Sequence, residues 1–159
     1  MRTLRSLKTV WIAVTAISLC LPLLAEVKVV LTANKIVLVD GKEQKESGDK
    51  AKPGEIIEYT AEYRNTGKAS VTNVMATLPV PSGMEFIPDT TQPQQVLAST
   101  DEKHYAPVPL KRTVPGADGR MVEQPVPYSE YRSLRWSLGD LPGGASKSVK
   151  ARMKVKTQK

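Results

Sequence analysis

The sequence predicts an all-β fold. The chain has 159 residues, and after residue 25 apolar and polar residues alternate with period two through most of it. Convincing apolar stripes with a period of 3.6 residues, as in helices, do not occur in this part. Turn signals rich in Gly, Pro, Asn and Asp separate the alternating runs at short intervals. Many short strands with frequent turns are typical of two packed antiparallel sheets. We therefore expect an immunoglobulin-like β-sandwich of about seven to nine strands, preceded by an amino-terminal signal helix.

Residues 1–25 have the composition of a signal peptide. Basic residues at positions 2, 5 and 8 precede an apolar run over 9–24, and Pro22 and Ala25 suit a cleavage point. We expect this segment to be removed on export and residues 26–159 to form one domain. An uncleaved anchor is the alternative, since about 16 apolar positions lie near the lower limit of a membrane-spanning helix. Contact with a membrane is expected only in that case.

Cleavage also changes the composition of the chain. Cys20 is the only cysteine, so the mature protein would contain no disulfide. The whole chain carries a net charge of +7, but three of its basic residues lie in the signal, which leaves 20 basic and 16 acidic residues. This mild excess does not point to nucleic acid. Export without disulfides favours a bacterial envelope, either the periplasm or the cell surface.

The individual elements follow from the alternation. Strands are predicted over 27–33, 35–39, 55–64, 74–78, 84–87, 134–138 and 149–155, with extended stretches at 95–98, 104–113 and 121–124 inside a proline-rich segment. Residues 40–52 are charged and contain two glycines, so we expect a solvated loop there. Glu58 alternates onto the outward face of its strand. Trp136, Tyr59 and Tyr63 alternate inward and are expected to pack in the core.

Several short motifs in a fixed order carry a family resemblance. They include Pro53-Gly54, Asn65-Thr66-Gly67, Leu78-Pro79, Leu134-Arg135-Trp136 and Pro142-Gly143. In this order they resemble the bacterial conserved-repeat domain known as domain of unknown function eleven, over about 27–156. The resemblance implies an immunoglobulin-like sandwich found in exported and surface proteins, often in tandem. It implies no catalytic or ligand residue, and this chain departs from it by its single copy and by the segment 99–132.

No constellation of side chains predicts catalysis, a metal or a cofactor. His104 is the only histidine, and it lies beside Asp101, Glu102 and Lys103 in a predicted loop. No thiol remains after cleavage, and zinc sites need several nitrogen or sulfur ligands. We therefore expect a protein that is not an enzyme, with no catalytic, cofactor-binding or metal-binding residue.

A row of basic residues along the last strand is the first candidate site. Lys150, Arg152, Lys154 and Lys156 share one strand face and lie about 6.8 Å apart. This basic row could bind an anionic envelope polymer such as lipopolysaccharide or teichoic acid. It could equally be a solvated face, since lysines on an outward strand discourage aggregation. Interleaved aromatic residues are absent from the row, which argues against nucleic acid.

Three tyrosines are the second candidate site. Tyr105, Tyr128 and Tyr131 lie in the proline-rich segment, residues 88–132, and loops on a rigid sandwich commonly bind partners. From these observations we expect an exported, non-enzymatic cell-envelope protein that acts as a structural or protein-interaction module. The alternative is a binder of anionic envelope glycopolymers through the basic row.

Overall fold

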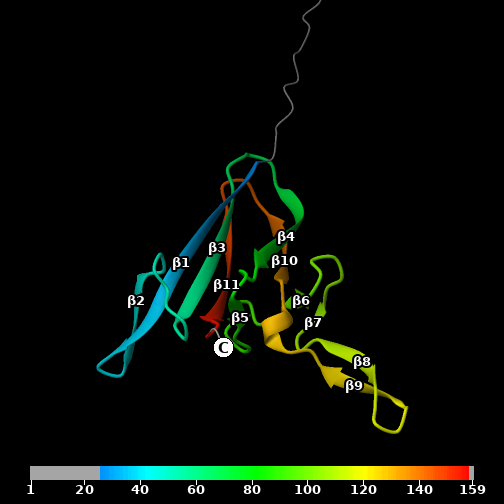
Figure 1. Ribbon diagram of the computed structural model, residues 1–159. Helices are drawn as coiled ribbons and strands as arrows, with labels where there is room; N and C mark the ends of the chain where they lie inside the picture. The colour runs from blue at the N-terminus through cyan, green and yellow to red at the C-terminus, as the bar shows by residue number, and fades with distance from the viewer. Residues whose placement is uncertain (1–25, 158–159) are drawn as a thin grey trace, which may run out of the picture.

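The computed structural model describes residues 26–157 and confirms the all-β, immunoglobulin-like sandwich (Figure 1). One sheet has the strand order β2-β1-β3-β11-β5 and the other the order β4-β10-β6-β7, while β8 and β9 form a separate pair. The predicted signal helix over residues 1–25 lies outside the described residues. Between residues 26 and 157, no helix is long and apolar enough to cross a membrane.

The chain forms eleven strands rather than the expected seven to nine. The first sheet contains β1 (Val27–Val39), β2 (Lys42–Ser47), β3 (Ile56–Asn65), β5 (Met84–Phe86) and β11 (Ser146–Val155). The second contains β4 (Val71–Pro79), β6 (Leu97–Ser99), β7 (Ala106–Pro107) and β10 (Ser133–Leu141). The separate pair is β8 (Lys111–Pro115) and β9 (Met121–Pro125), followed by the short 3-10 helix η1 (Tyr128–Glu130).

The core lies between the two sheets and follows the predicted alternation. Val149, Ala151 and Met153 of β11 are fully buried. Trp136 of β10 is also buried, and its indole Nε1 donates a hydrogen bond to the carbonyl oxygen of Pro93 at 2.9 Å. Tyr63 is buried as well, which confirms the inward orientation expected for β3. These side chains come from both sheets, so the alternating pattern correctly identified the faces that meet.

The prediction of a solvated loop over residues 40–52 is wrong. β1 continues unbroken to Val39, and Asp40 and Gly41 then turn the chain into β2. Both turn residues have positive φ, 52° and 73°, as a two-residue hairpin turn that follows the strand twist requires. An Asp-Gly pair is a strong hairpin signal. The many charged residues that follow it led instead to the prediction of a loop. All of β2 is exposed, which is why its sequence lacks an apolar face.

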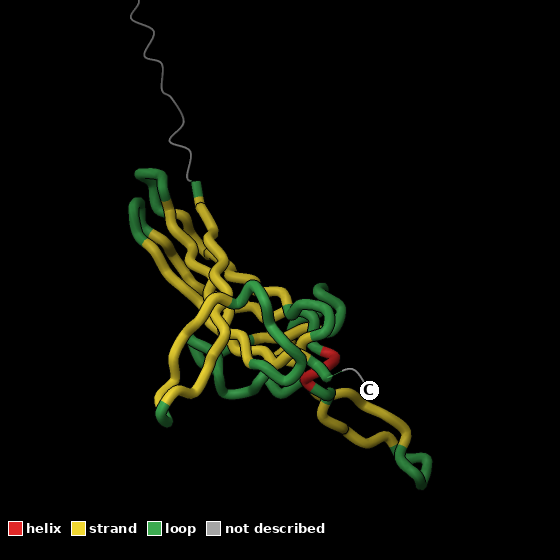
Figure 2. Tube along the Cα trace, turned by 60° about the vertical axis from the view of Figure 1, so that its left-hand side comes forward, coloured by secondary structure: helices red, strands yellow, loops and turns green. Residues whose placement is uncertain are grey.

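The proline-rich segment is partly extended, as expected. β6 and β7 complete the second sheet, and β8 pairs with β9 as an antiparallel hairpin. This hairpin stands away from the sandwich in both views of the molecule (Figures 1 and 2). Leu110 and Val126, at the base of the hairpin, are buried and join the core. The segment is therefore anchored at its base and exposed along its length.

Candidate functional site

The basic row lies in the middle of the first sheet, between β3 and β5, and its central member is not free. Arg152 donates two hydrogen bonds to the carboxylate of Glu43, at 2.8 and 2.7 Å. Its Nε donates a third to Glu58 at 3.1 Å. The bidentate pair with Glu43 fixes the plane of the guanidinium, and together with the bond to Glu58 it occupies three of the five N–H donors. Arg152 therefore holds two strands to β11 instead of presenting its charge to solvent.

Glu58, expected on the outward face of β3, is buried. Lys45 Nζ lies 2.6 Å from its other carboxylate oxygen, so Glu58 accepts from a base on each side. Burial alone would raise the pKa of Glu58, but the hydrogen bonds from Lys45 and Arg152 outweigh it and lower that pKa. Two acids and two bases thus form an ion cluster, consisting of Glu43, Lys45, Glu58 and Arg152.

The remaining members of the basic row differ in whether their side chains are bonded to other residues. Lys156 donates to the carbonyl oxygen of Ser129 at 2.8 Å, which ties it to η1. Lys154 is exposed, and Lys150 is half-buried beside a polar hollow of about 540 Å³ next to the ion cluster. Of the four, only Lys150 and Lys154 have no side-chain bond or ion pair within residues 26–157. The row presents two free cations instead of four.

The expected exposure of Tyr131 is wrong, because this side chain is fully buried. Its hydroxyl accepts a hydrogen bond from the backbone N–H of Leu110 at 2.7 Å, and its ring stacks on Phe86 with centroids 5.9 Å apart. Tyr128 is half-buried and meets both rings edge-on. The turn of η1 directs these two tyrosines under the base of the hairpin, where they fasten the proline-rich segment to the core.

Tyr105 is half-buried and supports a charged neighbour. Its hydroxyl donates to Ser133 Oγ at 3.0 Å, and the guanidinium of Arg135 lies over its ring, 3.5 Å from the centroid. A cation over an aromatic face gains electrostatic attraction, so the arginine is held flat. Arg135 Nε is buried, and within residues 26–157 it has no hydrogen-bond acceptor. Burying a hydrogen-bond donor without an acceptor costs about 1–3 kcal/mol, and such groups are rare in folded proteins.

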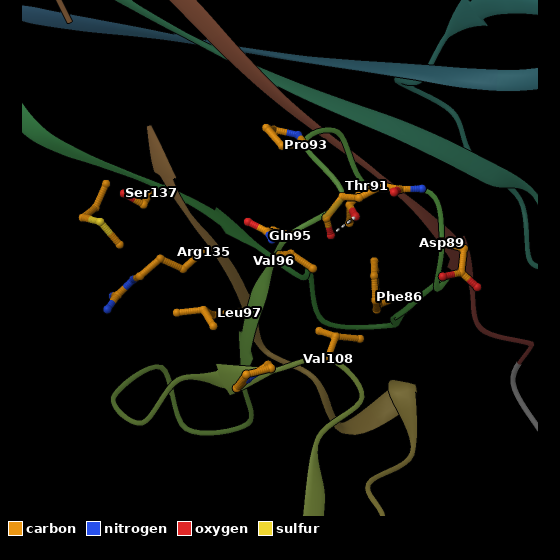
Figure 3. A pocket seen from close by; sticks show the side chains of 13 residues that line it. Phe86, Asp89, Thr91, Pro93, Gln95, Val96, Leu97, Val108, Arg135 and Ser137 are labelled. Carbon is orange, nitrogen blue, oxygen red and sulfur yellow. Dashed lines mark hydrogen bonds between the residues drawn. The ribbon is translucent and has the colours of Figure 1, made fainter. Parts of the chain in front are cut away.

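Arg135 borders a cavity of about 690 Å³ on the outer side of the second sheet (Figure 3). Arg135 and Leu97, which are paired across β10 and β6, lie on one side in this view, and Phe86 and Asp89 lie on the other. The apolar lining residues are Met75, Phe86, Pro93, Val96, Leu97, Pro107 and Val108, and the polar ones are Asp89, Thr91, Gln94, Gln95, Arg135 and Ser137. The volume lies in the range of ligand pockets, which combine apolar walls with polar groups.

The sequence did not reveal this pocket. Its lining comes from β4, β5, β6, β7 and β10, from the segment between β5 and β6, and from Val108 after β7, so it is spread from residue 75 to residue 137. One signal was available, because Arg135 stands between the inward residues Leu134 and Trp136 and therefore faces outward. No sequence pattern, however, shows which loops fold over that face.

His104 pairs with a carboxylate in an exposed loop. Its Nδ1 lies 2.6 Å from Asp101, which also accepts backbone N–H bonds from Lys103 and His104. The hydrogen bond to Asp101 raises the pKa of His104, and the same bond lowers the pKa of Asp101. This pair closes a turn.

The ion cluster and the pocket beside Arg135 are therefore the two candidate sites that the described structure adds to the sequence. Across residues 26–157, no three or more His, Cys, Asp or Glu side chains lie close enough together to hold a metal ion. A comparison of the chain with protein-family models, characterised proteins and solved structures finds no match.

Proposed function

We propose that this chain is an exported, non-enzymatic protein of the bacterial cell envelope, in the periplasm or on the surface, that works by binding another envelope protein. The signal composition of residues 1–25 supports export. The order of turn motifs supports membership in the conserved-repeat family of exported sandwiches. A sandwich that carries irregular segments at one end is a common scaffold for binding.

The pocket beside Arg135 is the observation that carries this proposal. Its apolar walls favour an apolar segment of a partner, because burying such surface is worth about 25 cal/mol per Å². Arg135 adds a positive charge at one side, held in place by the ring of Tyr105. A guanidinium held flat is well suited to a carboxylate, to which it can donate two parallel hydrogen bonds. The partner segment is therefore apolar with an Asp, a Glu or a terminal carboxylate.

A crosslinking experiment in the living cell tests this binding. A photoreactive amino acid replaces Gln95, which lines the pocket and is exposed. We expect one crosslinked envelope protein, and we expect the crosslink to be lost with Arg135→Gln, because the carboxylate then loses its charged partner. Arg132→Gln is the matched control, since Arg132 is an exposed arginine outside the pocket lining. A crosslink unchanged by Arg135→Gln would contradict the proposal.

A second candidate function is binding of an anionic envelope glycopolymer through the basic row. The free charges of Lys150 and Lys154 favour it. Retention on immobilised lipopolysaccharide should then fall in a salt-dependent way with the double variant Lys150→Gln and Lys154→Gln. Lys103→Gln and Lys111→Gln, which remove two exposed lysines elsewhere, are the control. Equal retention of both double variants would exclude the basic row. Arg152 is kept in this test because it belongs to the ion cluster.

A further inference from the structure

The first half of β1 has an outer edge without a neighbouring strand. β3 pairs with β1 from Val27 to Ile36 on one side, whereas β2 pairs with it only from Asn34 to Val39 on the other. The β2 side ends where the N–H of Gly48 donates to the carbonyl oxygen of Ala33 at 3.2 Å. Within residues 26–157, no strand continues along the edge from Val27 to Thr32.

The backbone groups at this edge point outward at alternate residues. Thr66 donates its N–H to the carbonyl oxygen of Glu26, so the even-numbered residues of β1 bond to β3. The bond from Gly48 to Ala33 shows that the odd-numbered residues face the other way. The N–H and C=O groups of Val27, Val29 and Leu31 are therefore directed to the open edge. Such a row of unpaired groups is a template for another strand.

The side chains along this edge are apolar and exposed. Val29, Val30 and Leu31 are 52%, 56% and 53% exposed. Val29 and Leu31 lie opposite Tyr63 and Ala61 of β3 and so share the inner face of the sheet, but the second sheet does not cover them. Three consecutive half-exposed apolar residues on an open edge are unusual, since natural edges are commonly protected by charge, proline or a covering element.

We infer that a second copy of this chain occupies the edge, with the two β1 strands antiparallel about a two-fold axis at Val29. In this register Val29 faces its own counterpart and Leu31 faces Val27, so all three outward-directed residues exchange N–H and C=O bonds. Glu26 of the second copy lies opposite Thr32, and the next position is already taken by Gly48. The two strands therefore fill the open edge and stop where β2 begins.

The charges near the edge fit this arrangement. Within its own chain Lys28 lies opposite Arg64 of β3, a like charge. In the paired register it lies opposite Val30 of the second copy, whose other neighbour is Glu62. Glu62 is exposed and makes no ion pair within residues 26–157. Two strand spacings separate these backbones by about 10 Å, a distance that lysine and glutamate side chains can bridge together. Between the two copies the pairing brings Lys28 of one close to Glu62 of the other and sets no like charges directly opposite each other.

Sedimentation of the exported protein tests the pairing. We expect a monomer–dimer equilibrium, and we expect Val29→Lys to raise the dimer dissociation constant at least tenfold, because two lysines then face each other at the axis. Met121→Lys is the matched control, since Met121 is 63% exposed on β9, away from the edge. A protein that stays monomeric up to about 1 mM would overturn the inference. So would a dimer that both substitutions affect equally.

A second variant checks the register without relying on affinity. Val29→Cys should form a disulfide between two copies under mild oxidation, because residues facing each other at the axis have Cα atoms about 5.5 Å apart. Thr72→Cys on β4, an exposed residue at the edge of the other sheet, should not do so faster than random collision. Crosslinking of Val29→Cys in the envelope to a different protein, with no self-dimer, would overturn the inference.

Discussion

β1 and β11 flank β3 in the same sheet and have similar alternation, but they differ in what covers them. In β11 the inward residues Val149, Ala151 and Met153 are fully buried, because β10 of the second sheet packs against this strand. In the first half of β1 the residues on the same inner face are half-exposed. An alternating pattern thus identifies which face of a strand is apolar. Whether that face is covered depends on how far the opposite sheet extends.

The largest difference between the two strands should appear when an inward side chain is truncated. Met153→Ala on β11 should destabilise the protein by about 3 kcal/mol, because it leaves a cavity in the core. Leu31→Ala on β1 should cost less than about 1 kcal/mol at a concentration where the protein is monomeric, since half of that side chain is already in water. Urea unfolding of the two variants measures both values. Equal losses would mean that β1 is covered as β11 is.

Two glutamates of β3, Glu58 bonded to β11 and Glu62 opposite Val30 of β1, should also differ in their effect on stability. Glu58→Gln should cost about 2 kcal/mol near pH 7, because Arg152 of β11 and Lys45 then lose their buried carboxylate. The lowered pKa of Glu58 means that its contribution is present above its unfolded value, near 4.5, and is lost as the pH falls through the folded value. Glu62→Gln, opposite Val30 of β1, should have little effect on the unfolding of the monomer.

Unfolding measured at several pH values separates these cases. The parent protein should lose stability on acidification below about pH 4.5, and Glu58→Gln should lose less over the same range. The Glu62→Gln variant should follow the parent. A Glu58→Gln variant with the parent's acid dependence would show that the ion cluster does not stabilise β11.

The smallest effects should come from the residues of each strand that face solvent. Lys154→Gln on β11 and Val30→Thr on β1 should each change the unfolding free energy of the monomer by less than about 0.5 kcal/mol, because both side chains are exposed. Thermal unfolding of dilute protein measures this. A loss of more than about 1 kcal/mol for Val30→Thr would indicate an internal contact along β1.

The sequence predicts more of the fold than of the site. The faces of β3 and β11 follow directly from alternation, because both strands are covered by the second sheet. β2 was not predicted, because a fully exposed strand needs no apolar face and so shows no alternation. The Asp40-Gly41 pair is the one local signal of its hairpin. Tyr131 was expected on the surface because prolines surround it, yet η1 turns it into the core. The pocket beside Arg135 is formed by segments that are distant in the sequence and adjacent in the fold. A local sequence pattern cannot predict that they come together.

The open edge of β1 is tested most directly by hydrogen exchange at single amides. The N–H groups of Val27, Val29 and Leu31 should exchange slowly at high protein concentration and progressively faster on dilution, because they bond only to a second copy. The N–H of Val30, which bonds to β3, should stay protected at every concentration. Fast exchange of the three outward amides at all concentrations would contradict pairing of two copies along β1.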